Sequence, residues 1–237
     1  MLTGINTGDF GKTTGERFVD LLRALDGVRG IDRYRISSIE PNLLSDEVIA
    51  FTAASEKFQP HFHIPIQSGC DRILGLMRHR YNTTKFAERI GAVRRAMPDA
   101  FLGIDVIVGF PGETDDDFAR TYDFLERIEP AFLHVFPYSV RPGTKAAAMA
   151  QVDMSVREER AARAAAVAER MHQGYLARCV GKTFPVLFEQ DRGEGSVGHA
   201  PNYMPVTVDV KGLHNTVQNV RITAVNGDGL RGEPEET

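Results

Sequence analysis

The stretch GIDVIVGFPGETDDDF at residues 103–118 joins an apolar run, a Gly-Phe-Pro-Gly turn and a group of carboxylates. Residues 101–108 are apolar on both faces, as expected of a buried parallel strand. Thr114 can cap a following helix, with Asp117 completing a capping box. The turn is therefore predicted at the carboxyl end of a strand, where ligands bind in open α/β sheets and βα barrels. A well-made turn that binds nothing is the alternative that this stretch leaves open.

Cysteine and histidine supply the other groups that could do chemistry. Cys70, in QSGCD, is expected near a helix start, where a thiolate is stabilised, but a small residue in a tight turn is the favoured interpretation. His61 and His63 alternate along a predicted strand and so share one face, as a metal-binding pair would. With no third ligand nearby, packing or surface roles are favoured, and no metal ligand is predicted.

A local excess of positive charge lies between residues 70 and 95, where seven basic residues stand against two acidic ones. Clustered Lys and Arg can contact a nucleic acid backbone, and Arg78, Arg80 and Arg89 are the predicted contacts. A solvated face of two surface helices explains the same pattern. The net charge of the whole chain is −4, which argues against non-specific adhesion to nucleic acid over its entire surface.

Helix-like and strand-like segments that position these groups alternate through the first 140 residues. Apolar residues recur on one helix face in three segments, at 18–25, 86–97 and 118–128. Strand-like runs lie at 34–39, 61–67, 101–110 and 132–138, with the end of a further strand at 2–6. Strands separated by single helices predict βαβ units with a parallel sheet.

The pattern changes at Ser155, where an Ala- and Arg-rich helix begins and continues to Gly181. After this helix, strand-like runs rich in β-branched residues follow at 183–189, 204–210 and 219–225. The predicted fold class is α/β, followed by a small antiparallel β-barrel or sandwich. The last six residues, 232–237, are expected to be disordered.

Five blocks in a fixed order carry a family resemblance. The blocks are LTGINTGDFG, RISSIEP, HIPIQSGCDRILGLMRHRY, DVIVGFPGET and LHVFPYSVRPGT, followed by the long helix and a tail with GHAPNYMPVTV and VRIT. They resemble the MiaB-like radical S-adenosylmethionine (SAM) methylthiotransferases, and most of all the MtaB-type enzymes that act on threonylcarbamoyladenosine in tRNA. The resemblance implies a partial radical SAM βα barrel with a long C-terminal helix over residues 1–180. It implies a TRAM-like, RNA-binding β-barrel of the OB-like type over residues 181–237.

The same resemblance implies the reaction and its cofactors. Members of the family use S-adenosylmethionine and two 4Fe–4S clusters to insert a methylthio group at carbon 2 of a modified adenosine. The substrate lies next to the anticodon, so the implied partner is the anticodon stem-loop of tRNA. We therefore expect a cytoplasmic protein without a membrane partner, and no segment approaches about 18 consecutive apolar residues.

The resemblance also implies a cofactor face built from strand ends, beginning with the loop Thr3-Gly4-Ile5-Asn6. The residues implied to line this face are Thr3, Gly4, Asn6, Ser38, Glu40, Gln67, Asp105, Gly109 and Gly112. Residues implied nearer the nucleotide are Tyr138 and Arg141, and those available for unpaired bases are His199, Asn202, Tyr203 and Arg221. Glu40 and Asp105 could instead serve as a cap or a buried helix partner.

One departure from the family concerns the clusters. The sequence contains no CxxxCxxC loop, and Cys70 and Cys179 are too few to hold either cluster. We therefore expect the C-terminal part of such an enzyme, lacking the first barrel strand, whether truncated, split or degenerate, and inactive by itself. The missing segment could be a separate chain, and the sheet edge at 2–6 could promote self-association. A non-catalytic RNA-binding remnant is the alternative.

Overall fold

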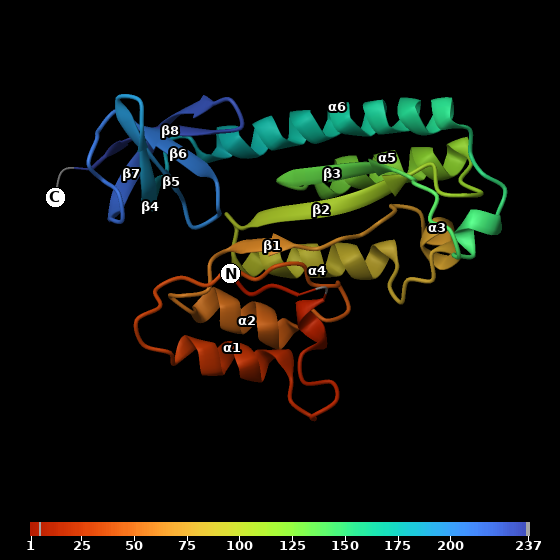
Figure 1. Ribbon diagram of the computed structural model, residues 1–237, viewed down its shortest axis with the longest axis horizontal. Helices are drawn as coiled ribbons and strands as arrows, with labels where there is room; N and C mark the ends of the chain where they lie inside the picture. The colour runs from red at the N-terminus through yellow and green to blue at the C-terminus, as the bar shows by residue number, and fades with distance from the viewer. Residues whose placement is uncertain (5, 236–237) are drawn as a thin grey trace. The chain divides into compact units, whose positions relative to one another are not determined.

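The computed structural model describes residues 1–4 and 6–235 and divides into two compact units (Figure 1). The first unit is Met1–Glu169 and the second is Arg170–Thr237. Ile5 of the predicted cofactor loop and the last two residues lie outside the described part of the chain. The division falls within the long helix, some residues before the boundary expected from sequence at 180–181.

A three-stranded parallel sheet organises the first unit. Its strands are β1 (His61–His63), β2 (Phe101–Val108) and β3 (Phe132–Pro137), in the order β1-β2-β3. The parallel sheet confirms the predicted α/β class. The runs predicted as strands at 2–6 and 34–39 form only isolated bridges, in which Leu2 pairs with Ile36 and Ser38 pairs with His63. The backbone hydrogen bonds of the 34–39 run are divided among three segments of the chain, so no single pairing extends into a continuous ladder.

Helices connect and flank these strands. They are α1 (Phe18–Asp26), α2 (Asp46–Ala54), α3 (Asp71–Leu76), α4 (Thr83–Ala96) and α5 (Asp115–Ile128), with single 3₁₀ turns at Thr7–Asp9 and Ala146–Ala148. The long helix α6 spans Met154–Cys179. Thr114 caps α5 and Asp117 completes a capping box, as predicted from the sequence. The helices expected from periodicity are thus confirmed as α1, α4, α5 and α6.

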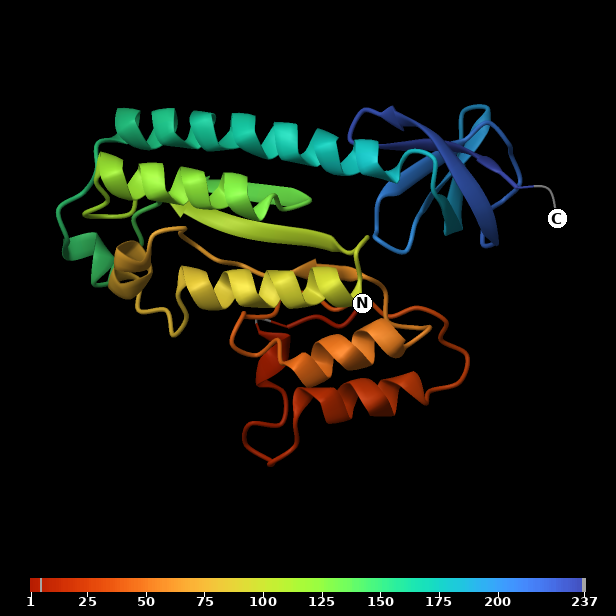
Figure 2. The same ribbon diagram turned by 180° about the vertical axis from the view of Figure 1, so that it is seen from behind.

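The two faces of the sheet differ in what covers them. Helix α5 lies behind β2 and β3 in Figure 1 and in front of them in Figure 2. On this covered face, Val108 packs with Phe118 of α5 and Ala164 of α6. The opposite face carries Asp105, which is half-buried, and His134, which is exposed. Polar side chains of the sheet are therefore displayed on its open face.

The second unit is a closed barrel. Its strands are β4 (Thr183–Arg192), β5 (Gly195–His199), β6 (Pro205–Val208), β7 (Val217–Asn226) and β8 (Gly229–Pro234). They close in the order β4-β5-β6-β8-β7 around a predominantly apolar interior. The fully buried core residues are Val186, Phe188, Val206, Val208, Val220, Ile222 and Leu230.

The barrel differs from its prediction in two details. Strands β6 and β8 run parallel, with Val206 opposite Leu230, so the barrel is mixed rather than antiparallel. Closure requires this pairing because β8 follows β7 in a hairpin and must also meet β6 on its other side. Residues 232–234, expected to be disordered, belong to β8. No helix within the described residues is both long and apolar enough to cross a membrane.

Candidate functional site

The candidate site is a cavity of about 560 Å³ at the carboxyl ends of β2 and β3. Its lining includes Gln67, Asp105, Tyr138 and Arg141, four residues predicted separately from sequence. Backbone pairing places Gln67 beside β2, because its N–H donates to the carbonyl of Asp105 at 2.9 Å and its carbonyl accepts from Ile107 at 2.8 Å. Gln67 has a positive φ of 72°, and its pairing with β2 is confined to this single bridge. Tertiary structure thus brings together residues from three segments of the chain.

A hydrogen-bonded chain of side chains joins Asp105 to Ser38, another predicted residue. Ser38 Oγ lies 2.5 Å from His63 Nδ1, and His63 Nε2 lies 2.8 Å from Asp105 Oδ1. Ser38 and Asp105 were predicted as cofactor contacts, whereas His63 was assigned to packing or the surface. The structure makes His63 the link between them. The bridge that pairs Ser38 with His63 holds this arrangement in place.

His63 has two further potential ligands beside it, contrary to the sequence-based expectation that no third ligand lies nearby. One nitrogen of His63, a carboxylate oxygen of Asp105 and one nitrogen of His134 all lie within 4.8 Å of one another. His61, the partner suggested by alternation, is not in this group and stacks on Phe101 at 4.8 Å between ring centroids. Burial lowers the pKa of His61 to about 3, with a contribution from the charge of Arg35.

The N-terminal loop is hydrogen-bonded to the backbone beside the Ser38–His63–Asp105 chain of side chains. Asn6 Oδ1 accepts from the backbone N–H of Glu40 at 3.5 Å, and the Thr7 hydroxyl donates to the carbonyl of Ser38 at 2.9 Å. Asn6, Ser38 and Glu40 are therefore close to one another. Thr3 and Gly4 are exposed, and neither they nor the other three line the cavity.

The turn from Gly109 to Gly112 packs against helix α6. Both glycines have a positive φ, and a Cβ at Gly109 would lie 2.4 Å from Cγ of Arg157. The N–H of Gly109 donates to Glu113 Oε2 at 3.0 Å, and Glu113 is paired with Arg160 at 2.9 Å. Burial raises the pKa of Glu113. These contacts give the turn a packing role, and neither glycine lines the cavity.

Neither cysteine is arranged for nucleophilic or cluster chemistry. Cys70 is buried at the start of α3, where burial raises the pKa of its thiol. Its Sγ donates to Asp117 Oδ1 at 3.3 Å, and the Arg72 guanidinium holds the pKa of Asp117 well below its usual range. Cys179 is buried in the second unit. The two cysteines of this chain do not fit a 4Fe–4S cluster, which needs three or four thiolates.

A second cavity, of about 540 Å³, lies between α3 and α5. Its walls carry both signs of charge, including Arg72, Asp116, Asp117 and Arg120. Arg72 and Asp117 already neutralise each other there. The strand-end cavity is the better candidate because it collects the predicted polar residues at the ends of parallel strands.

The arginines of the predicted basic cluster differ in their exposure and in their hydrogen-bond partners within the chain. Arg78 and Arg80 are exposed. Arg89 has only 14% of its side chain exposed and donates to Asp46 Oδ1 at 2.6 Å. Arg94 donates to the carbonyls of Ile128 and Glu129. Arg78 and Arg80 are therefore accessible on the surface, while Arg89 is held by its own carboxylate partner.

The second unit presents a stacked aromatic pair on its surface. The His199 and Tyr203 rings lie 4.4 Å apart at 10°, and Tyr203 is 40% exposed. Arg221 is exposed on β7. Asn202, predicted to contact bases, is instead 1% exposed, because its amide donates to the Tyr175 hydroxyl and accepts from the N–H of Met204. The structure thus gives Asn202 an internal role.

Comparison with known proteins places the chain among radical SAM proteins. Residues 6–125 match the radical SAM superfamily. The chain is 41% identical over 214 residues to the threonylcarbamoyladenosine tRNA methylthiotransferase MtaB of Bacillus subtilis, covering 87% of this chain and 48% of that protein. It is 40% identical over 195 residues to the tRNA-2-methylthio-N(6)-dimethylallyladenosine synthase of Bifidobacterium longum subsp. infantis, covering 81% of this chain and 40% of that protein.

The structural comparison agrees at the level of fold. The radical SAM enzyme coproporphyrinogen III oxidase of Escherichia coli matches with a TM-score of 0.50 at 13% sequence identity. The match covers 80% of this chain and 46% of that one. The chain spans about half the length of the curated relatives and of the solved structure that it matches.

Proposed function

Since this chain belongs to the radical SAM superfamily, we propose that it is part of a tRNA methylthiotransferase. The proposed reaction inserts a methylthio group at carbon 2 of a modified adenosine next to the anticodon, with threonylcarbamoyladenosine as the preferred substrate. The observation that carries this proposal is the 41% identity to a methylthiotransferase over most of the chain. The strand-end cavity supports it, because Gln67, Asp105, Tyr138 and Arg141, which were predicted as cofactor or nucleotide contacts, line it together.

The strand ends offer suitable groups for S-adenosylmethionine. The Asp105 carboxylate can accept from ribose hydroxyls, and the Gln67 amide can both donate and accept. Asn6, Ser38 and Glu40 would lie toward the amino acid part of the cofactor, with Thr3, Gly4, Gly109 and Gly112 as further proposed contacts. In this superfamily, S-adenosylmethionine cleaved at an iron–sulfur cluster supplies the radical. The two cysteines of this chain do not fit such a cluster.

The nucleotide would approach from the side of Tyr138 and Arg141. Arg141 is exposed at the mouth of the cavity, where a guanidinium can bind a phosphate oxygen. Tyr138 is fixed by an edge-on contact with Phe110 and by the Arg157 guanidinium, which lies 5.4 Å from its ring centre. The aromatic wall and the neighbouring cation suit a nucleotide better than a purely apolar ligand.

Two surfaces are proposed to hold the rest of the tRNA. Arg78 and Arg80 would contact phosphates, which contribute affinity without reading sequence. The paired rings of His199 and Tyr203, with Arg221, would stack on and bind unpaired bases. A non-catalytic RNA-binding role is the second candidate, and the observation that favours it is that the chain has only two cysteines.

The test measures tRNA binding by the chain over a series of salt concentrations. Removing both Arg78 and Arg80 by substitution with Ala should weaken binding to every tRNA and reduce the salt slope by about one unit for each lost phosphate contact. Arg89→Ala is the matched control, because Arg89 is paired with Asp46 and should leave the slope unchanged. An unchanged slope in the double variant would remove these arginines from the interface.

Base recognition is tested on the second surface. Tyr203→Ala should cost about 1–3 kcal/mol of binding free energy on an anticodon stem-loop with accessible bases, and much less on a fully paired duplex. Equal losses on both RNAs would indicate a general effect on folding rather than stacking. A stem-loop with threonylcarbamoyladenosine should compete better than one with dimethylallyladenosine, and the reverse order would reassign the substrate.

A further inference from the structure

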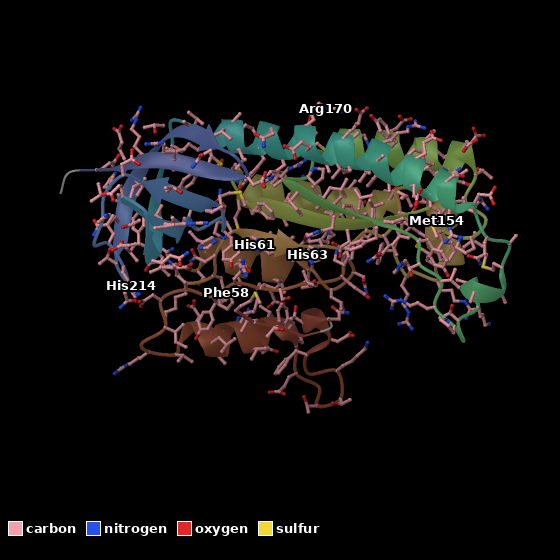
Figure 3. The ribbon with its side chains drawn as sticks, turned by 45° about the horizontal axis from the view of Figure 1, so that its top comes forward. Phe58, His61, His63, Met154, Arg170 and His214 are labelled. Carbon is pink, nitrogen blue, oxygen red and sulfur yellow. The ribbon has the colours of Figure 1, made fainter. Side chains whose placement is uncertain are left out.

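We propose that His63, Asp105 and His134 form a binding site for a divalent transition-metal ion on the open face of the sheet. The proposal goes beyond the proposed function, which assigns no role to either histidine and requires no such ion. It rests on the placement of three side chains by three neighbouring strands. Figure 3 shows His63 on β1 together with His61, which is not part of the proposed site.

Strand register brings the three residues together. Asp105 of β2 and His134 of β3 are direct partners across the parallel ladder. His63 of β1 pairs with Gly103, two residues before Asp105 and on the same face of β2. Because alternate residues of a strand point to one face, these three side chains project from the same side of the sheet. The backbone hydrogen bonds of the sheet therefore fix the origin of each ligand.

The distances are close to those required by one ion. His63 Nε2 and Asp105 Oδ1 are 2.8 Å apart, and one nitrogen of His134 lies within 4.8 Å of a ligand atom of each residue. Ligands at about 2.1 Å from a metal lie at most about 4.2 Å from each other. His134 is exposed, so a small rotation of its side chain is enough to close the difference. Nearby Phe132 and Phe136 limit the other orientations of its ring.

The ligand types indicate the class of metal. Two imidazoles and one carboxylate suit first-row ions such as Zn²⁺, Co²⁺ or Fe²⁺, whereas Mg²⁺ and Ca²⁺ prefer oxygen ligands alone. Three protein ligands leave at least one coordination position for water or another small ligand. Asp105 also lines the strand-end cavity, so that open position is reachable from the cavity. The second carboxylate oxygen of Asp105 remains able to accept from a ribose.

An outer partner supports the orientation of His63. Metal-bound histidines usually donate their other ring N–H to an oxygen, which fixes the tautomer and the ring plane. Ser38 Oγ lies 2.5 Å from His63 Nδ1 and is placed to accept that hydrogen bond. Nε2 of His63 is then directed toward Asp105, as metal binding requires. The backbone carbonyl of Ser38 is itself held by Thr7, whose hydroxyl donates to it at 2.9 Å.

The experiment titrates the chain with Co²⁺ alone and follows the visible absorption of the bound ion, with calorimetry using Zn²⁺ as a second readout. We expect one equivalent to bind with the absorption of a nitrogen- and oxygen-ligated Co²⁺. His134→Ala should abolish this binding without unfolding the chain, because His134 is exposed. Ser38→Ala should weaken it by about 10–100-fold, as expected for loss of an outer partner.

Two control variants separate this site from general histidine binding. His61→Ala removes the neighbour on the same strand, and His214→Ala removes an exposed histidine of the second unit. Both should bind Co²⁺ like the unaltered chain. Binding that persists in His134→Ala, or its absence from the unaltered chain at millimolar Co²⁺, would overturn the proposal. In that case, His63 and Asp105 form only a hydrogen-bonded pair. Circular dichroism of each variant checks that folding is retained, and tRNA binding is not involved in any readout.

Discussion

The open sheet of the first unit and the closed barrel of the second use their inner surfaces in opposite ways. The sheet packs one face on helices and displays Asp105 and His134 on the other, so its pleat presents chemical groups directly. The barrel fills its interior with apolar side chains and leaves His199, Tyr203 and Arg221 on its outside. A closed five-stranded barrel has room inside only for its own side chains. Its function is therefore restricted to its surface.

The two units also differ in their buried charges. Among the described residues, the buried carboxylates and guanidinium groups are Glu113, Asp117, Arg157 and Arg160, all in the first unit. They lie around the turn that follows β2 and hold it against α5 and α6. The barrel has no buried group of this kind among its described residues. Charge pairing thus fixes loops in the first unit, and apolar packing fixes the second.

The largest expected effect tests the closed interior of the barrel. Phe188→Ala should destabilise the second unit by about 3–5 kcal/mol, because it removes a fully buried ring. Phe136→Ala, on the open face of the sheet, should change stability by no more than about 0.5 kcal/mol, because 48% of Phe136 is already exposed. Hydrogen exchange resolved by segment measures each unit separately. Similar effects of both variants would contradict the contrast between the two surfaces.

The buried ion pair of the first unit gives a comparable but pH-dependent effect. Arg160→Met leaves Glu113 buried without its partner and should cost about 3–5 kcal/mol near pH 8. Burial already raises the pKa of Glu113, so this cost should grow as pH rises and shrink as pH falls and the carboxyl becomes protonated. Denaturant unfolding at pH 5 and pH 8 measures the difference. The additional change Glu113→Leu should recover most of the loss, and failure to do so would indicate a packing effect of Arg160 alone.

Glycine substitutions test how closely the barrel strands are packed, and their expected effect on stability is of intermediate size. Gly198→Ala would place a Cβ 2.1 Å from the carbonyl oxygen of Leu187, so β4 and β5 must move apart, at a cost of about 1–3 kcal/mol. Gly75→Ala in α3 is the matched control, because nothing lies within 4 Å of its added Cβ. The control should stabilise the chain by about 0.5–1 kcal/mol. Thermal unfolding that ranks the two variants the other way would show that the barrel can relax around Gly198.

A small effect at neutral pH is expected at His61. His61→Phe keeps the stacking on Phe101 and should change stability by less than about 1.5 kcal/mol at pH 7. The folded-state pKa of His61, about 3, lies below its ordinary value of 6.5, so the neutral ring stabilises the fold above pH 6.5 and this contribution is lost as pH falls toward 3. The Phe variant lacks that loss and should become more stable relative to the unaltered chain between pH 7 and pH 4. A constant difference over this range would contradict the pKa of the buried ring.

The sequence by itself determined the elements that depend on local periodicity and capping. Helix α5 is amphipathic and begins with a capping box at Thr114 and Asp117, both of which can be read without knowledge of tertiary contacts. The apolar run of β2 likewise identified a buried parallel strand. Strands β5 and β8 were not predicted, because glycines at 195, 198, 229 and 232 resemble turns. The barrel needs all four of these glycines, because a Cβ at any of them would lie less than 3 Å from an atom of a neighbouring strand.

Only the tertiary structure decided which polar residues act together. Alternation along one strand associated His63 with His61, because sequence shows neighbours along the chain but not across a ladder. The register of β1, β2 and β3 instead associates His63 with Asp105 and His134. The same limit applied to Arg89 and Asn202, whose residue types suit RNA but whose partners, Asp46 and Tyr175, are distant in sequence. Local periodicity follows from the geometry of a single helix or strand, whereas the pairing of polar groups depends on long-range packing that one sequence does not display.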